Sequence, residues 1–368
     1  MFSTFYDRHD RPIPPIELTW GSLATIAPPV PTPIAAAPPR SPDHVIDARD
    51  VEPETLLPIG RRVVAAGPFA WALCTTSKLH TIHHRLSGDL AVVPGAERLY
   101  TVGSDGMLSA WSLTSERELY ALPIGSGEHL RCMLVDVSGP HVLEVDTIVG
   151  RAWQMTIPLT QIEVADLTGA GPPRDGLATG VKTELVFYGE HNTNAATKDE
   201  HRLVLAGDGF VAELDRAGQP RWVGQSDFIT SGVELIGAHV GVIIDRPRPQ
   251  LLILDGDGAA KGIVEISRAA RFIGRATRGA WIGDGTRALL VDRSGQAAVH
   301  LLFDDAVVAA APLPGHRTAV AAGSSVHIWH AERGVIDRLQ ASDAIRAVAM
   351  ADGVLFAATE YEILTWKL

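Results

Sequence analysis

Cysteine is almost absent from this chain: there are two, Cys74 and Cys132, among 368 residues. They do not form a CxxC pair, so the sequence excludes the disulfide framework of a small secreted domain and a cysteine-rich zinc module. Both lie among apolar residues, where a free cysteine is usually a small buried side chain. We interpret both as core residues.

Long apolar runs are also missing. No stretch reaches the roughly 18 residues that a membrane helix needs. The first ten residues carry charges where a signal peptide needs its apolar run. We therefore expect a soluble, cytoplasmic protein without a membrane partner.

Basic residues are outnumbered: 32 Lys and Arg face 43 Asp and Glu, which gives a net charge of −11. A field of this sign repels phosphate backbones, so we expect no nucleic-acid partner. With 46% hydrophobic residues, the chain can still bury a sizeable core. Its length corresponds to one large domain or two medium ones, at about 150 residues each.

Helical periodicity is nearly absent, whereas Gly (35) and Pro (24) are abundant. Helix interiors exclude both residues, but short strands joined by tight turns accommodate them. Ten prolines lie between Pro12 and Pro42, and they favour an extended chain that cannot join a sheet interior. The sequence predicts a Pro-rich strap or tether over residues 1–60 and a β-rich domain over residues 61–368. Alternatively, the prolines could dock into an aromatic groove on a partner.

The clearest repeating unit spans Asp89 to Pro123. It reads as four short strands around an Asp-Gly turn, which is typical of an antiparallel meander. The predicted strands are Leu90 to Val93, Arg98 to Val102, Met107 to Leu113 and Glu118 to Leu122.

Similar four-strand patterns return at intervals of roughly 35–50 residues, a period that indicates a propeller. The expected inner strands begin near Val63, Leu90, Leu130, Glu184, Val233, Phe272, Val307 and Ile345. Seven four-stranded blades fit if Val63 to His84 shares a sheet with the C-terminal strands, which would close the ring and leave no open sheet edge. Eight blades are the alternative.

Two of these repeats resemble the third-strand signature of WD-repeat propellers: Asp105 to Leu119, around Trp111, and Ser325 to Gly334, around Trp329. A third, Gly209 to Trp222, is similar to a quinoprotein-type (PQQ-type) repeat. The resemblance covers about residues 62–368 and implies an all-β propeller fold. No repeat carries the full Gly-His and Trp-Asp pattern, so the chain is an irregular relative of those repeats.

Several motifs suggest a metal or cofactor, but we interpret them as turns. His80 and His84 would lie roughly 13 Å apart on one strand, too far apart to share an ion. Asp255 to Gly258 lacks the later ligands of a calcium loop. Gly-Asp-Gly also occurs at 207–209 and 283–285, again between strands, where the glycines would supply positive φ. The sequence thus indicates no catalytic, cofactor-binding or metal-binding residue.

Tryptophan recurs about once per repeat, within or beside strands. We interpret this spacing as packing between blades, and an aromatic ligand cage is the alternative. The residues are Trp111, Trp153, Trp222, Trp281, Trp329 and Trp366.

The polar stretch Gly189 to His201 lies between two apolar strands, and we expect a solvent-exposed loop there. Loops on rigid scaffolds often carry binding residues. The candidate partner-binding residues are His191, Asn192, Asn194, Lys198, Asp199 and Glu200. A Gly/Pro loop from Asp166 to Asp175 is a second candidate.

These features favour a non-catalytic protein-protein interaction scaffold, a subunit of a bacterial multi-protein complex. This step rests on the fold, which also hosts enzymes. Two alternatives remain: a propeller enzyme or small-ligand sensor that uses the central channel, and a regulatory partner of an ATPase or protease in a stress or defence module.

Overall fold

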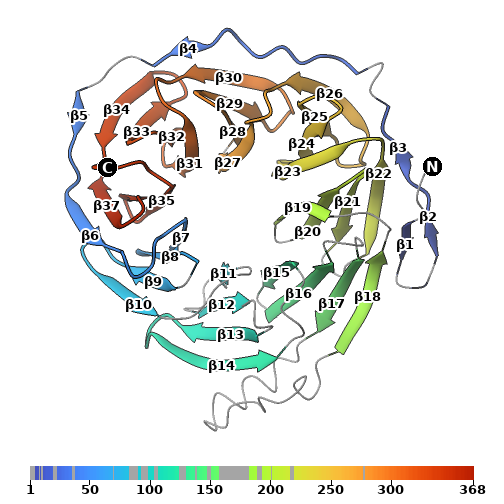
Figure 1. Cartoon of the computed structure of the whole chain (residues 1–368), viewed down its shortest axis with the longest axis horizontal. Helices are drawn as coiled ribbons and strands as arrows, with labels where there is room; N and C mark the ends of the chain where they lie inside the picture. The colour runs from blue at the N-terminus through green and yellow to red at the C-terminus, as the bar shows by residue number, and fades with distance from the viewer. Residues whose placement is uncertain are drawn as a thin grey trace. The chain divides into compact units, whose positions relative to one another are not determined.

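The structure is a computed structural model of the whole chain. It describes residues 5–7, 9, 11–19, 23–34, 38–68, 70–82, 90–92, 98–102, 107–123, 130–136, 139–146, 151–156, 182–188, 193–199, 201–215, 219–276 and 278–368. The described elements are all β-strands, as the sequence predicts, and they form eight sheets (Figure 1). Eight sheets favour the alternative of eight blades, although the blade number itself stays a prediction.

The chain divides into two compact units. The first comprises Met1–Ser22, Leu86–Glu234 and Asp255–Ala260. The second comprises Leu23–Arg85, Leu235–Leu254 and Lys261–Leu368.

Three sheets belong to the first unit. One has the order β15 (Leu130–Asp136), β16 (Gly139–Asp146), β17 (Arg151–Thr156), β18 (Lys182–Tyr188), β1 (Phe5–Asp7) and β2 (Pro12–Ile13). Another is the predicted meander β11 (Leu90–Val92), β12 (Arg98–Val102), β13 (Met107–Ser112) and β14 (Arg117–Pro123). The third is β19 (Thr193–Lys198), β20 (Arg202–Gly207), β21 (Phe210–Asp215), β22 (Pro220–Gln225) and β3 (Ile16–Glu17).

The chain passes between the units within one further sheet, which has the order β23 (Ile229–Ile236), β24 (His239–Arg246), β25 (Gln250–Leu254) and β26 (Ala260–Glu265).

Four sheets belong to the second unit. The first is β10 (Leu79–Ile82), β9 (Trp71–Cys74), β8 (Arg62–Ala66) and β7 (Thr55–Ile59). The second is β27 (Arg271–Ala276), β28 (Gly279–Asp284), β29 (Arg287–Asp292), β30 (Ala297–Leu302) and β4 (Thr32–Pro33). The third is β31 (Val307–Leu313), β32 (Arg317–Ala322), β33 (Ser325–His330), β34 (Gly334–Gln340) and β5 (Pro39–Arg40). The fourth is β35 (Ala347–Ala351), β36 (Val354–Ala358), β37 (Glu362–Lys367) and β6 (His44–Asp47).

Three details of the predicted strand order were wrong. Val63 does not begin a first strand, because it lies in β8 and its sheet begins at β7. Strands β8 and β9 do not share a sheet with β35, β36 and β37, because β6 supplies the fourth strand of that C-terminal sheet. The strand at Glu184 does not begin a sheet. It lies in β18, and the next sheet begins at β19.

The expected boundary at residue 60 falls in the turn between β7 and β8, which pair antiparallel from Thr55 to Ala66. Strand β7 therefore lies on the strap side of that boundary. The division into a strap and a propeller domain stays a prediction.

The N-terminal segment, in its described residues 23–34 and 38–47, pairs with the outer strands of successive sheets (Figure 1). Thr25 forms a parallel bridge to Ile263, β4 runs parallel to β30, and β5 runs parallel to β34. Parallel pairing at an edge uses few backbone donors, so a proline-rich chain can supply it. An outer edge paired in this way presents fewer free N–H and C=O groups.

The predicted Gly-Asp-Gly turns are confirmed. Their last glycines, Gly209, Gly258 and Gly285, adopt φ values of 81°, 80° and 62°. These angles lie in the left-handed region, where a side chain is costly.

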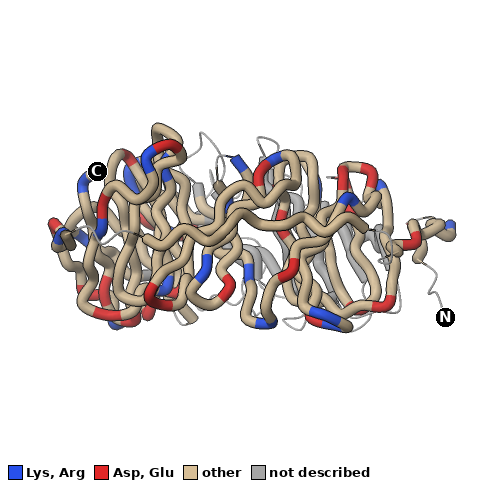
Figure 2. The backbone as a smooth tube through the Cα atoms, turned by 90° about the horizontal axis from the view of Figure 1, so that it is seen from above, with Lys and Arg blue, Asp and Glu red and all other residues tan. Residues whose placement is uncertain are grey.

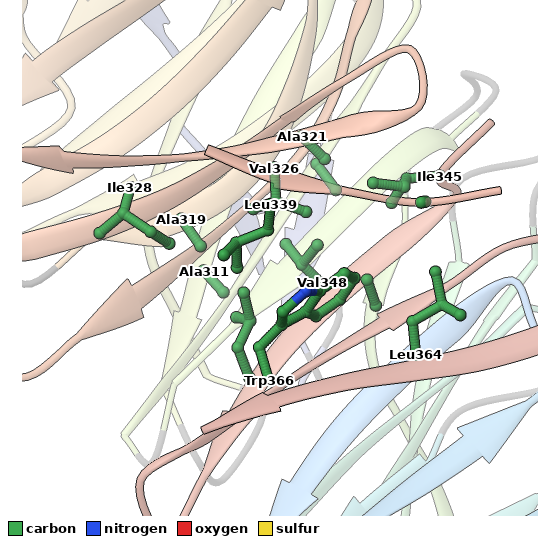
Figure 3. Packing of buried hydrophobic residues seen from close by; sticks show 14 of the residues in the cluster. Ala311, Ala319, Ala321, Val326, Ile328, Leu339, Ile345, Val348, Leu364 and Trp366 are labelled. Atoms are coloured by element: carbon green, nitrogen blue, oxygen red, sulfur yellow. The ribbon is translucent and has the colours of Figure 1, made fainter. Parts of the chain in front are cut away.

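The core of the second unit lies between neighbouring sheets, whose first strands β27, β31, β35 and β7 contact one another in that order. Between the last two C-terminal sheets, Trp366 and Val348 pack against Val326 and Leu339 (Figure 3). Trp366 has no exposed surface. Burying an aromatic side chain of this size contributes about 3 kcal/mol. The expected packing role is confirmed for the tryptophans whose side chains are described: Trp111, Trp222, Trp281, Trp329 and Trp366 are all less than 9% exposed.

The close approach of β27 and β31 depends on Gly274. A Cβ at this position would lie 2.0 Å from the carbonyl oxygen of Ala310. Because that neighbour is backbone, Gly274→Ala must separate the two strands, and we expect it to lower the free energy of unfolding by about 3 kcal/mol. The matched control is Gly285→Ala, which has left-handed φ but open space around it, and should cost about 1 kcal/mol. Urea denaturation measures the free energy of unfolding of both variants. Equal losses in the two variants would contradict the close packing at Gly274.

Candidate functional site

A groove in the second unit lies at one end of two neighbouring sheets. In an antiparallel meander, the first and third connections lie at the same end of the strands. Arg278 belongs to the connection between β27 and β28, and Asp292 is the last residue of β29, directly before the connection to β30. His316 and Arg333 occupy the corresponding connections of the next sheet. Polar side chains at four connections are thereby brought to the same end of the two sheets.

Two adjoining hollows make up this groove, with volumes of about 440 and 270 Å³. We call it the Trp329 groove, because the indole lines both hollows. The residues shared by the two are Ala298, Val299, Trp329 and Ala331. The larger hollow is completed by Pro29, Val30, Thr32, Pro33, Ile34, His300, Leu301, Arg333, Gly334 and Val335, and the smaller by Ala276, Arg278, Leu290, Asp292, His316, Arg317 and Thr318.

The N-terminal segment forms one wall of the larger hollow. His300 Nδ1 donates a hydrogen bond to the carbonyl oxygen of Pro29 (3.0 Å), and the Ile34 amide donates to Leu302 O (3.1 Å). Between these two bonds, Val30 is 86% exposed. The wall therefore presents an apolar side chain to solvent at the edge of the hollow.

Trp329 joins this groove to the core. Its ring meets that of Trp281 edge to face, with centroids 5.5 Å apart and an interplanar angle of 84°. This is a favoured aromatic geometry, worth about 1 kcal/mol beyond the area it buries. Trp281 is fully buried and Trp329 is 8% exposed, so the contact fixes the orientation of the indole that the groove presents.

The polar rim is mostly cationic. Arg278, Arg317 and Arg333 face a single carboxylate, Asp292, and no carboxylate in the described part of the chain forms an ion pair with any of the three arginines. Along the described chain as a whole, both signs of charge are interspersed (Figure 2). The groove is thus a local cationic site on an acidic protein.

Asp292 offsets only one of the three guanidinium charges of the rim, and its Oδ1 is engaged by its own turn. It accepts hydrogen bonds from Ser294 N (2.8 Å), Ser294 Oγ (2.6 Å) and Gln296 N (3.1 Å). Burial acts to raise the pKa of Asp292, but these hydrogen bonds outweigh it and the pKa is lowered.

Arg278 and His316 approach each other, with 3.4 Å between Nη2 and Nδ1. Since a guanidinium only donates, His316 Nδ1 accepts in this contact. Arg317 Nε donates to Pro314 O (2.8 Å) and holds the neighbouring turn, which leaves its terminal nitrogens for a ligand.

His327 lies two residues before Trp329 on the same face of β33. Its ring meets Phe303 edge to face at 5.1 Å, and its Nδ1 has no hydrogen-bond partner in the described structure. Burial, together with the charge of Arg338 and against that of Asp304, lowers the pKa of His327 from 6.5 to about 4. The imidazole is therefore neutral near pH 7.

The partner-binding residues predicted from the sequence lie elsewhere, in the first unit. The expectation of a loop was wrong for Thr193–Lys198, which forms β19, the first strand of its sheet. Lys198 is its last residue, and His191, Asn192, Glu200 and the second candidate loop lie outside the described residues. Asn194 and Asp199 are five residues apart on an extended chain, roughly 17 Å, so the structure does not bring them together.

The two candidates whose side chains are described, Asn194 and Asp199, already have internal partners. Asn194 Nδ2 donates to Asp208 Oδ1 (2.8 Å) and to Thr230 O (3.1 Å). Asp199 accepts from Arg202 Nε (2.9 Å), and Arg202 also pairs with Glu213 (3.3 Å), which is 1% exposed. Burial acts to raise the pKa of Asp199, but its hydrogen bonds, led by that from Arg202, outweigh burial and lower it. A role of these residues in partner binding stays a prediction.

No cluster of three or more His, Cys, Asp or Glu among the described residues could hold a metal ion. In the motif that resembles a calcium loop, Asp255 Oδ1 instead accepts hydrogen bonds from Asp257 N (3.0 Å) and Ala259 N (2.9 Å) of its own turn. Cys74 is fully buried, as expected, and burial raises the pKa of its thiol to about 12. The described residues contain no helix that could span a membrane.

The sequence interpretation missed the groove because its residues come from six separate segments. One signal was available. Leu18, Ile26 and Ile34 recur at intervals of eight, and each donates its amide to the outer strand of a different sheet. An eight-residue apolar repeat in a Pro-rich stretch indicates edge pairing rather than a free tether.

The lowered pKa of His327 predicts a specific pH dependence of stability. Because the folded state takes up this proton only near pH 4 and the unfolded state near 6.5, acidification through that window favours unfolding. Allowing for the partial exposure of the ring, we expect His327 to account for about 2 kcal/mol of lost stability. His327→Gln should flatten the dependence of unfolding free energy on pH between 6.5 and 4, while both proteins behave alike above pH 7. Parallel curves for the two proteins would contradict the assignment.

Comparisons with known proteins give structural matches only. No family model and no curated protein sequence matches the chain. Sqt1 from Saccharomyces cerevisiae is similar with a TM-score of 0.64 and 11% identity, over 89% of this chain and 98% of that one. Chaetomium thermophilum Sqt1 bound to the N-terminus of the ribosomal protein L10 gives 0.63 and 12%, over 89% and 100%. BamB from Moraxella catarrhalis gives 0.58 and 13%, over 88% and 98%.

Identities this low establish the fold alone. The solved structures that match include a WD40 domain, that of Sif2. The matches and the eight described sheets together confirm the fold that the repeats predicted: the chain is a β-propeller that resembles WD-repeat and quinoprotein-like proteins.

Proposed function

We propose that this protein is a non-catalytic interaction scaffold, and that a partner protein contacts it at the Trp329 groove. The observation that carries the proposal is the groove itself: an apolar floor at Trp329 under a rim of three arginines that lack carboxylate partners among the described residues. Interfaces are enriched in tryptophan and arginine, and clefts of a few hundred Å³ are the usual binding sites.

The comparisons support this kind of role. In the Chaetomium structure, a protein of similar fold is bound to the N-terminus of another protein. A propeller can present rigid turns to a partner without changing its own sheets, because function resides in sites placed on the fold. Membership of a bacterial multi-protein complex, a cytoplasmic location and an ATPase or protease partner stay predictions.

Photo-crosslinking from the edge of the groove tests this proposal. A benzophenone amino acid at Val30, which is 86% exposed, should trap one defined protein in cells of the native host. The matched control position is Val45, an exposed valine of the same unit that does not line the groove. Charge reversal of Arg278 and Arg333 should reduce the Val30 product at least about tenfold, since loss of about 1.4 kcal/mol of binding free energy is tenfold in affinity.

The expected result is one cross-linked species at Val30, absent at Val45 and sensitive to the arginine variant. Equal products at both positions, or a Val30 product indifferent to Arg278 and Arg333, would contradict a partner at the groove.

A further inference from the structure

We infer that the partner presents to the Trp329 groove an extended acidic segment, with an apolar side chain against Trp329 and carboxylates at the arginines. This inference rests on the proposed function and specifies the chemistry of the same site.

The shape of the groove favours an extended segment. The two hollows adjoin at Trp329, Ala331 and the β30 residues Ala298 and Val299, so a ligand that fills both must cross the indole. The rim charges lie on either side of that point: Arg333 lines the larger hollow, and Arg278 and Arg317 line the smaller. A peptide with acidic residues on both sides of an apolar residue matches this arrangement.

The charge of the rim selects the sign of the ligand. Three guanidinium groups surround an apolar floor, and the only carboxylate in the lining, that of Asp292, offsets one of the three charges. A guanidinium next to apolar surface binds a carboxylate more strongly than it would in open water. A basic segment would leave these arginines unpaired in the interface, which costs binding energy.

Nucleic acid fits these features less well. Trp329 is only 8% exposed, so a ligand side chain can contact a small part of the indole but a base cannot stack on its face, and single-strand binding sites depend on such stacking. The net charge of −11 also opposes the approach of a long polyanion, whereas a short acidic segment meets mainly the local field of the rim.

Recognition at this site depends on side chains rather than on addition of a strand. The outer edges of β30 and β34 are already paired with β4 and β5 at Leu301, Leu302, Arg338 and Leu339. A partner strand cannot pair at those residues without displacing the N-terminal segment. The apolar contacts left to a ligand include Val30, Pro33 and Trp329.

Selection of peptides from a random nine-residue library displayed on phage, with the full chain as bait, tests this inference. We expect enriched peptides to carry net negative charge and at least one apolar residue. Synthetic copies should bind at least about tenfold more weakly to the double variant Arg278→Glu and Arg333→Glu, and more weakly at 0.5 M than at about 0.05 M salt.

The matched control is Arg271→Glu with Arg287→Glu. Both arginines are exposed. They begin strands β27 and β29, at the end of that sheet opposite to the groove. This control variant should bind the synthetic peptides with the same affinity as the unmodified chain. If the double groove variant fails to fold, Arg333→Glu alone, in an exposed turn, should still weaken binding severalfold.

The outcomes separate the two claims. Neutral or basic peptides that depend on Arg278 and Arg333 would overturn the acidic segment and leave the scaffold at this groove standing. Peptides that bind both double variants equally, or no enriched peptide at all, would overturn the inference. The cross-linking experiment at Val30 tests the proposed function independently of that result. Competition by an eight-residue oligothymidine at equal concentration would replace the peptide with nucleic acid and overturn the inference.

Discussion

Hydrogen bonding at the outer edges of the sheets is the constraint on which the second unit depends. The outer strand of an antiparallel meander carries a row of N–H and C=O groups with no partner in its own sheet, and a bare edge invites pairing with other chains. Here β4, β5 and β6 take those places on three sheets, and a bridge at Thr25 does so on a fourth. Proline is tolerated because only a few amides, such as those of Ile26 and Ile34, need to donate. The same chain that covers the edges also builds a wall of the groove, so protection of the edge and formation of the binding site are one feature.

Trp329 carries the second part of the account, since it belongs both to the core and to the groove. Its edge-to-face contact with the fully buried Trp281 holds the indole in one position. A floor that is fixed in advance lowers the entropy lost when a ligand binds. Arg278 and Arg333, in contrast, sit on turns, and neither forms an ion pair with a carboxylate in the described part of the chain, so affinity can be adjusted at the rim without disturbing the core.

The sequence predicts those features that depend on residues close together in the chain, and it fails for those that depend on residues far apart. Strands such as Arg98–Val102 and turns such as that at Gly258 depend on local pattern and on φ, and both were predictable. Strand β19 could not be predicted, because its sequence Thr-Asn-Ala-Ala-Thr-Lys has the polarity of a loop. It is a strand because its backbone pairs with that of β20. The groove could not be predicted from local pattern either. Pro29 and Arg333 line the same hollow although some 300 residues separate them in the sequence, and no local signal encodes that proximity.

Hydrogen exchange along the N-terminal segment tests the central claim most directly, which is that this segment is a fixed part of the second unit and of its groove. The amides of Ile26 and Ile34 bond to Ile263 and Leu302, so the account predicts that they exchange at least about a hundredfold more slowly than in an unstructured peptide, as expected for protected sheet edges. Exchange of residues 23–34 at unstructured rates, alongside full protection of β30 and β34, would mean that the segment is a free tether. The Trp329 groove would then lose its wall, and the account would be contradicted.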